Sequence, residues 1–235
     1  MRRSPFIWLG SGRTRRRAVA RKGRLLDQAA RADLPVPSGG ILLDEFYQIC
    51  LTEGLAEQVG DVVVVPDPIW LHEVLYQDVR FPRLPQVVAV RSATAVSADH
   101  ARLDQIARLD VDFYDPLQLA TALREAWTAM NRVNDYQSRD ILVMEMVKSQ
   151  TAGTALTAAA VVQDQVTVIT SKPGEERGSF AMDRLRAFQR KSGELPHFAQ
   201  RLQMLLRGVR RTFGRGDWRI DWADDGQICW LLQVH

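Results

Sequence analysis

The chain has 235 residues, of which 46% are hydrophobic and 25% charged, and its net charge is +3. This size and composition suit one large globular domain or two lobes that share a cleft, and they exclude wholesale disorder. No apolar run reaches the roughly 20 residues that a membrane-spanning helix needs, and two cysteines are too few for a disulfide framework or a four-cysteine zinc site. We therefore expect a soluble, cytoplasmic protein without a membrane partner.

The first 31 residues are strongly basic. They hold ten arginine and lysine residues against one acid, Asp27, so this segment carries +9 and the remaining chain −6. Such a block is typical of a nucleic-acid arm, a transit peptide or an anion site. A transit peptide is disfavoured because residues 6–10 predict a strand and residues from Lys22 onward a helix. Nucleic-acid binding is disfavoured because no stacking aromatic residues lie between Arg13 and Arg24.

Strands and helices alternate through the first half of the chain. Asp67 followed by Pro68 is the expected order of an N-cap and the first helical residue, and Asp44 is a second expected N-cap. The expected elements are a strand at 6–10, a helix at 22–32, a strand at 40–43, a helix at 44–54, a strand at 62–65, a helix from 67 and a strand at 87–91, followed by a polar loop over 92–104.

The second half has more hairpin signals. Asp115-Pro116 predicts a helix start, and Asp224-Asp225-Gly226 is a strong turn signal between two alternating strands. The expected elements are a helix at 115–132, a strand at 141–147, a hairpin of 154–162 and 166–170, a polar loop over 171–179, a helix at 198–213 and a final hairpin of 217–223 and 227–234. The fold class is therefore α+β, or mixed α/β. The hairpin signals indicate antiparallel strands, whereas the alternation of strands and helices indicates parallel ones.

Five motifs follow one another along the chain. They are Lys22-Gly23 with LPVPSG (34–39), VRSAT (90–94), VMEMV (143–147), GTALT (153–157), and Phe213-Gly214 with IDWA (220–223) and LLQ (231–233). In this order they resemble the N-terminal nucleotide-binding domain of the phosphoenolpyruvate synthase and pyruvate phosphate dikinase family. The resemblance implies one ATP-grasp-like unit over residues 1–235, with a lobe of about 1–132 and a lobe of about 133–235 around a nucleotide cleft.

The resemblance makes Lys22 and Arg91 the expected catalytic and phosphate-binding cations, with Ser92 and Thr94 as hydroxyl neighbours. A site for ATP must offset the triphosphate charge with cations held on rigid elements. Lys22 lies at an expected helix start, and Arg91 ends an apolar strand, where a guanidinium can hold two phosphate oxygens. The alternatives are a solvated lysine in a basic stretch and a strand-end arginine paired with a surface acid.

Glu145, Met146 and Val147 correspond to the family's adenine-binding strand. Adenine needs a hydrogen-bond donor and an acceptor in a dry slot, and the edge of an apolar strand supplies both. The alternative is that this strand of methionine and valine belongs to the hydrophobic core.

The last hairpin is expected to hold Mg²⁺ through Asp221 and Gln233, since hard oxygen ligands suit this ion. Strict alternation around the turn places Cys229, Leu231 and Gln233 on the same face as Asp221. The alternative is an ion pair between Asp221 and Arg219 or Arg215.

Several positions depart from the family pattern. Ala20, Arg21 and Asp104 stand where the family has glycines, Arg219 stands where it has an acid, and His235 where it has an arginine. The family's phosphohistidine and barrel domains also do not fit into 235 residues. The expected function is therefore binding of ATP and Mg²⁺, with phosphoryl transfer to a histidine on a separately encoded partner that binds phosphoenolpyruvate. The alternative is a catalytically degraded relative with a regulatory or scaffold role.

Overall fold

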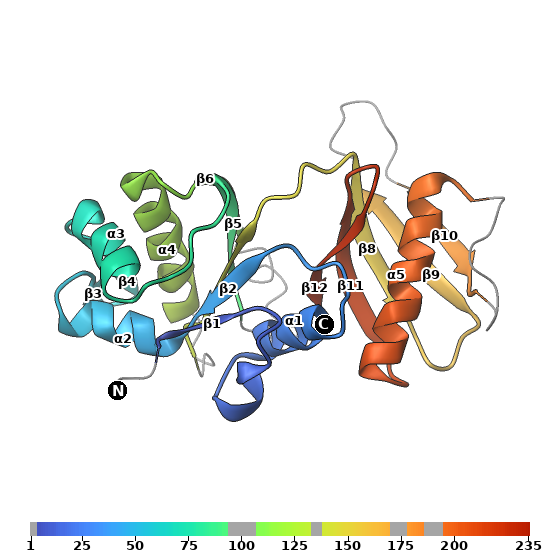
Figure 1. The fold of residues 1–235 in the computed structure, drawn as a ribbon, viewed down its shortest axis with the longest axis horizontal. Helices are drawn as coiled ribbons and strands as arrows, with labels where there is room; N and C mark the ends of the chain where they lie inside the picture. Colours follow the sequence, from blue (N-terminus) through green and yellow to red (C-terminus); the bar gives the residue numbers. More distant parts are fainter. Residues whose placement is uncertain (1–3, 94–106, 133–137, 170–177, 186–194) are drawn as a thin grey trace. The chain divides into compact units, whose positions relative to one another are not determined.

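The computed structural model describes residues 4–93, 107–132, 138–169, 178–185 and 195–235 (Figure 1). The chain divides into two compact units. Unit 1 comprises Met1–Arg24 and Ser38–Met146, and unit 2 comprises Leu25–Pro37 and Val147–His235. This division differs from the expected one near residue 132, because the strand at 141–145 pairs inside the first sheet and residues 25–37 associate with the second unit.

Unit 1 is built on a five-stranded sheet with the strand order β1-β2-β7-β5-β6. A short β3–β4 hairpin and three helices accompany this sheet, and α4 contacts β5 and β6. The elements are β1 (Phe6–Trp8), the 3-10 helix η1 (Arg13–Arg16), β2 (Gly39–Leu42), α2 (Asp44–Thr52), β3 (Glu57–Val59), β4 (Val62–Val64), α3 (Pro68–Gln77), β5 (Val87–Ser92), β6 (Ala107–Asp112), α4 (Pro116–Asn131) and β7 (Ile141–Glu145).

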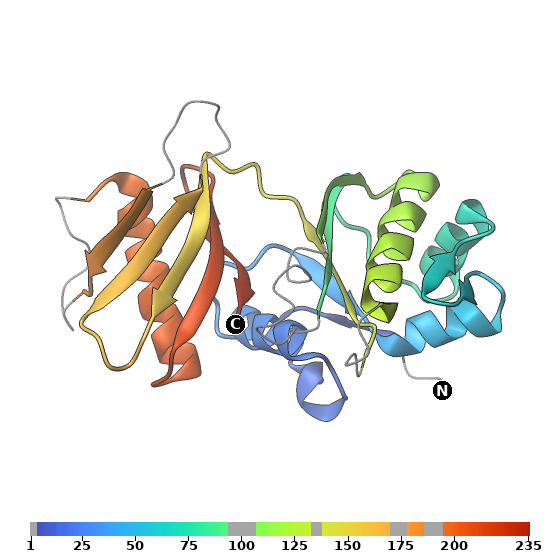
Figure 2. The same cartoon turned by 180° about the vertical axis from the view of Figure 1, so that it is seen from behind.

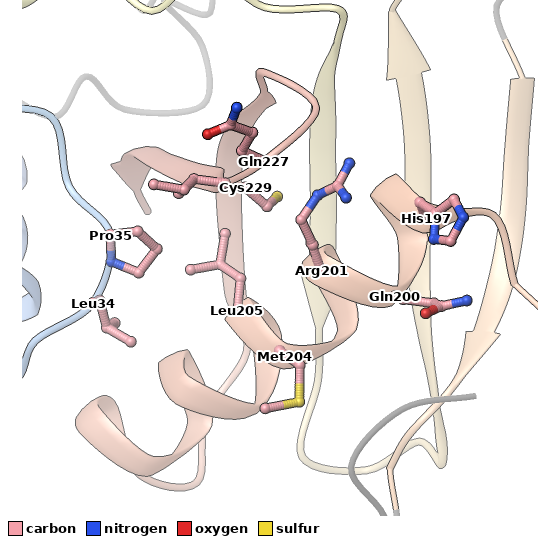
Figure 3. Close-up of a pocket in the computed structure, with 10 residues that line it drawn as sticks. Leu34, Pro35, His197, Gln200, Arg201, Met204, Leu205, Gln227 and Cys229 are labelled. Carbon is pink, nitrogen blue, oxygen red and sulfur yellow. The ribbon is translucent and has the colours of Figure 1, made fainter. Parts of the chain in front are cut away.

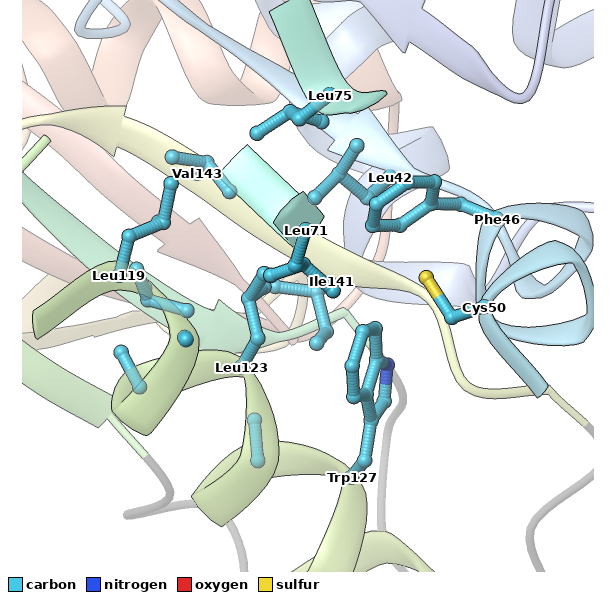
Figure 4. Packing of buried hydrophobic residues seen from close by; sticks show 14 of the residues in the cluster. Leu42, Phe46, Cys50, Leu71, Leu75, Leu119, Leu123, Trp127, Ile141 and Val143 are labelled. Carbon is cyan, nitrogen blue, oxygen red and sulfur yellow. The ribbon is translucent and has the colours of Figure 1, made fainter. Parts of the chain in front are cut away.

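The core of unit 1 lies between these helices and one face of the sheet (Figure 4). Trp127 of α4 packs against Phe46 of α2, with ring centroids 6.1 Å apart, and Ile141 and Val143 of β7 face the same cluster. Burial of each such large apolar side chain stabilises the fold by about 1.5–3 kcal/mol. The side chains of β7 that alternate with this pair therefore point to the opposite face of the sheet.

Unit 2 is a second five-stranded sheet, with the order β10-β9-β8-β11-β12. Helix α5 lies along one face of this sheet and contacts β8, β11 and β12 (Figure 2). The elements are β8 (Thr151–Thr157), β9 (Gln163–Ile169), β10 (Gly178–Asp183), α5 (His197–Phe213), β11 (Trp218–Asp224) and β12 (Cys229–Val234), and α1 (Arg21–Arg31) continues from unit 1 into unit 2.

The mixed α/β class is confirmed, but the expected parallel alternation is wrong. Every strand pair among the described residues is antiparallel. Sequence analysis missed β3, β6 and β10, which are short or largely exposed and so lack a strong apolar alternation. Asp67 and Asp115 cap α3 and α4 as expected, whereas Leu43 rather than Asp44 is the N-cap residue of α2.

Candidate functional site

A buried carboxylate organises one end of the sheet in unit 1. Asp140 is 1% exposed and accepts hydrogen bonds from the backbone N–H groups of Ala20 (2.7 Å) and Asp44 (2.8 Å). Its own carbonyl oxygen accepts a hydrogen bond from the N–H of Ala93 at 2.9 Å. Burial is the main cause that raises the pKa of Asp140 above its ordinary value. Asp140 thus joins the segment before Lys22 to the segment after Arg91.

Asp140 was missed by sequence analysis. Its position directly before a strongly apolar strand is the only local signal that marks it. The two N–H groups that it binds lie 120 and 96 residues away in the sequence, so nothing in its neighbourhood could reveal them.

Strand register places Arg91 on the face of this sheet that α1 approaches. Arg91 of β5 lies opposite Leu142 of β7, and Leu142 lies opposite Ile41 of β2. Directly opposed residues of antiparallel strands point to the same face. A Cβ atom on Gly23 would lie 3.0 Å from Cδ1 of Ile41, so the first turn of α1 lies over this face. Lys22 belongs to that turn, and its 2% exposure makes the interpretation as a solvated cation wrong.

Ser92 and Glu145 lie on the other face of the same sheet. Ser92 pairs with Ile141 and Glu145 with Val88, and both apolar partners belong to the core of unit 1. Ser92 is 4% exposed. The register therefore separates the Ser92 side chain from that of its neighbour Arg91. Thr94 and Asp104 lie outside the described residues.

The expected adenine-binding strand uses most of its backbone donors inside unit 1. The N–H of Glu145 donates to the carbonyl of Ser38 (2.8 Å), and the N–H of Met146 donates to the carbonyl of Val87 (3.1 Å). Within the described part of the chain, Val147 makes no backbone hydrogen bond. Of the three expected residues, Val147 is the one whose N–H group donates no backbone hydrogen bond within the described residues.

Asp221 and Gln233 are brought together in unit 2. They lie directly opposite each other on β11 and β12. The Asp221 side chain is 27% exposed, whereas Gln233 is buried. Nε2 of His235 lies 3.4 Å from Oδ2 of Asp221, and among the described residues this contact takes the place of the expected alternative pairing with Arg219 or Arg215. Among the same residues, no three histidine, cysteine or acidic side chains lie together so that they could hold a metal ion.

A polar row crosses the sheet of unit 2 from this pair. Thr154 of β8 lies opposite Asp221, Thr167 of β9 opposite Thr154, and Ser179 of β10 opposite Thr167. The hydroxyl oxygens of Thr167 and Ser179 are 3.0 Å apart. The alternate residues Ile220 and Trp222 of β11 are fully buried.

The expectation that Cys229 and Leu231 share the face of Asp221 is wrong. The register shifts between Asp221 and Trp222, so that Trp222 pairs with Leu231 and Asp224 with Cys229. A bulge of one residue reverses the faces of all side chains on one side of it. Cys229 and Leu231 therefore lie with Trp222, while Gln233 keeps the face of Asp221.

A pocket of about 610 Å³ lies inside unit 2 against α5 (Figure 3). None of the expected nucleotide-binding residues that the structure describes lines it. The guanidinium of Arg201 holds the buried Asp224 by two contacts of 2.7 Å, which neutralise the main charge at this pocket. Burial raises the pKa of the Cys229 thiol, which also lines it. The full lining is Leu34, Pro35, His197, Gln200, Arg201, Met204, Leu205, Gln227, Ile228 and Cys229.

No protein-family model matches the chain, and no curated protein matches its sequence. Within the described part of the chain, no helix combines the length and the apolar character needed to cross a membrane.

Solved structures similar to the chain include three proteins with ligase or ATP-grasp descriptions. The D-alanine–D-alanine ligase from Bacillus anthracis complexed with ATP has a TM-score of 0.48 at 9% identity, over 90% of this chain and 53% of the ligase. The VanG D-Ala:D-Ser ligase from Enterococcus faecalis has a TM-score of 0.47 at 12% identity, and the match covers 90% of this chain and 50% of that ligase. The RimK domain ATP-grasp protein from Sphaerobacter thermophilus has a TM-score of 0.41 at 14% identity, and the match covers 89% of this chain and 55% of that protein.

The chain thus spans about half the length of these structures. The helices and sheets of this chain by themselves assign it to the mixed α/β class. Similarities with TM-scores below 0.5 give no information about its ligand or activity. The expected resemblance to phosphoenolpyruvate synthase and pyruvate phosphate dikinase is not supported by these structures, which are ligases and a RimK domain protein.

Proposed function

We propose that this chain is an ATP-grasp-like unit that binds ATP with Mg²⁺ and is related to the N-terminal domain of the phosphoenolpyruvate synthase and pyruvate phosphate dikinase family. One observation carries the proposal. The first turn of α1, which bears Lys22, and the side chain of Arg91 share one face of the sheet in unit 1. Two cations that are 69 residues apart in the sequence thereby become candidates to bind the same polyphosphate chain.

Arg91 is the main phosphate ligand in this proposal. A guanidinium on a rigid strand can hold two phosphate oxygens at once, and fixed cations offset the triphosphate charge. Asp140 acts as a positioning residue, because it holds Ala20, two residues before Lys22, and Ala93, two residues after Arg91. Lys22 completes the cationic side of the site.

The base binds at Val147 in this proposal. Its backbone N–H and carbonyl are available in the described structure, whereas the N–H groups of Glu145 and Met146 are occupied.

Asp221 and Gln233 would hold the magnesium ion. A carboxylate oxygen and an amide oxygen on adjacent strands are the hard donors that Mg²⁺ prefers, so this pair fits the ion. An ion held by this pair would supply positive charge that offsets phosphate charge and would favour attack on the terminal phosphoryl group. The further part of the proposal is that this group passes to a histidine on a separately encoded protein that binds phosphoenolpyruvate.

Calorimetric titration of the purified chain with ATP and MgCl₂ tests the proposal. Arg91→Ala should weaken binding by about 10- to 100-fold, because hydrogen bonds to a charged group contribute about 1.5–3 kcal/mol. Arg83→Ala is the matched control in unit 1, since Arg83 is exposed. Absence of binding at millimolar ATP, or equal affinity of the Arg91→Ala variant, would contradict the proposal.

A second candidate function is a non-catalytic regulatory or scaffold subunit of the same fold. The contact between His235 and Asp221 favours it, because the imidazole competes for the carboxylate expected to hold Mg²⁺. Arg219, two residues before Asp221 on the same strand, adds a positive charge where the family has an acid. ATP turnover or phosphorylation of a histidine, lost in the Arg91→Ala variant, would reject this candidate.

A further inference from the structure

A second pocket lies in unit 1, where β1 is followed by the 3-10 helix η1. Its volume is about 400 Å³, and it is lined by Ser4, Phe6, Arg13, Arg16 and Arg17. Three of the five lining residues are arginines, and none is an acid. The pocket contains none of the residues assigned above to ATP or Mg²⁺.

The geometry of η1 explains why two of these arginines meet at the pocket. A 3-10 helix has three residues per turn, so the side chains of residues i and i+3 point in the same direction. Arg13 and Arg16 have this spacing, whereas Arg15 lies on another side of the turn and does not line the pocket. The local backbone therefore directs two like charges into one cavity.

The described structure neutralises only one of the three charges. Arg17 forms an ion pair with Glu45 (2.7 Å) and also donates to the carbonyl oxygen of Ser4. The guanidinium groups of Arg13 and Arg16 have no ion-pair partner among the described residues. Two adjacent cations repel each other, and an anion between them would remove that repulsion.

The wall of the pocket supplies a further donor. The hydroxyl oxygen of Ser4 is buried and makes no hydrogen bond within the described residues. Buried polar groups are almost always hydrogen-bonded, so this hydroxyl lacks a partner that a bound molecule can provide. Phosphate oxygens accept hydrogen bonds from both hydroxyl and guanidinium groups, and arginine holds them in pairs.

We propose that this pocket binds a small phosphate-bearing anion through Arg13, Arg16 and the hydroxyl of Ser4. A small ligand is favoured over a nucleic-acid strand because the charges line a confined cavity and Phe6 is the only aromatic residue among its described lining residues. The Phe6 ring packs edge-on against Phe81 at a centroid distance of 5.2 Å, which ties it to the protein rather than leaving it for base stacking.

Calorimetry with inorganic pyrophosphate at low salt, without nucleotide or metal, tests this site. The Arg13→Gln/Arg16→Gln double variant should lose at least tenfold in affinity, and Ser4→Ala about threefold to tenfold. Arg15→Gln is the matched control, because it removes the same charge from the same turn outside the pocket, and it should stay within about twofold. Arg13 and Arg16 are exposed, so the double variant should keep the wild-type circular dichroism and melting temperature.

Wild-type affinity for pyrophosphate in the double variant would overturn the proposal, and so would an equal loss of affinity in Arg15→Gln. A third overturning outcome is a short single-stranded DNA that binds more tightly than pyrophosphate and loses this affinity in the double variant. The Arg91→Ala variant distinguishes binding of pyrophosphate in this pocket from binding at the proposed ATP site. Retention of the pyrophosphate affinity in Arg91→Ala supports the pocket in η1, and its loss assigns the binding to the ATP site and overturns the inference.

Discussion

Replacement of Asp140 by alanine is expected to destabilise unit 1 by about 3 kcal/mol. The carboxylate accepts hydrogen bonds from the N–H groups of Ala20 and Asp44, at 2.7 and 2.8 Å. Hydrogen bonds to a charged group contribute about 1.5–3 kcal/mol each. Because Ala20 and Asp44 are only partly buried, the lower value applies to each bond. Asp140→Asn keeps one acceptor oxygen and should lose about half as much.

Urea unfolding followed by tryptophan fluorescence measures this effect, and Trp127 is a fully buried reporter in unit 1. Asp61→Ala is the control, since Asp61 is exposed and surface changes of this kind stay within about 0.5 kcal/mol. Amide hydrogen exchange should also become faster at Ala20 and Asp44 in Asp140→Ala. Equal stability of Asp140→Ala and Asp61→Ala, with unchanged exchange at both amides, would refute the reasoning.

The pH dependence of the same variants follows from the pKa shift. Burial raises the pKa of Asp140 above 3.8, so the folded state binds the proton more tightly than the unfolded state. The resulting stabilisation is fully present below the unfolded pKa and is lost as pH rises through the folded pKa. The advantage of the wild type over Asp140→Asn should therefore shrink as the pH rises above 3.8 and through the raised pKa of Asp140. A growing advantage would show that the pKa is lowered instead.

Two further substitutions are expected to reduce stability, and one buried thiol is expected to react slowly. Asp164→Asn should cost about 3 kcal/mol in urea unfolding, because the carboxylate is fully buried and its two arginine partners, at 2.8 and 2.6 Å, would lose their counter-charge. Gly153→Ala should cost about 1–3 kcal/mol, since the new Cβ would lie 2.0 Å from the carbonyl oxygen of Thr167, whereas Gly178→Ala meets open space and should be neutral in the same assay. Burial raises the pKa of the Cys50 thiol to about 12, so alkylation at neutral pH should be at least about tenfold slower in the native chain than in denaturant, and equal rates would contradict this assignment.

Local sequence signals predicted the elements that depend on neighbouring residues. Asp67 and Asp115 each precede a proline and cap their helices through side-chain bonds of 2.9–3.2 Å to N–H groups two and three residues ahead. Gly226 supplies the positive φ of the last hairpin turn. The missed strands gave no comparable signal, because β6 is largely exposed and its pairing with β5 is what makes it a strand.

Residues of the candidate site could be proposed from the sequence, whereas their arrangement on the two sheets could not. The order of motifs singled out Lys22, Arg91, Asp221 and Gln233 from the sequence, but it did not determine which side chains share a face. The pairing of Asp221 with Gln233 agrees with alternation around the turn, yet one bulge places Leu231 and Cys229 on the opposite face of the sheet.

The sequence by itself determined the starts of α3 and α4, the last turn and the residue types that suit a nucleotide, since these depend on interactions within a few positions. Only the tertiary structure decided the antiparallel register, the burial of Asp140 and the faces of Arg91 and Ser92. The physical reason is that strand pairing and burial join groups about a hundred residues apart, as Asp140 does with Ala20 and Asp44. The free energy of strand pairing and burial therefore depends on the folded chain as a whole rather than on any local segment.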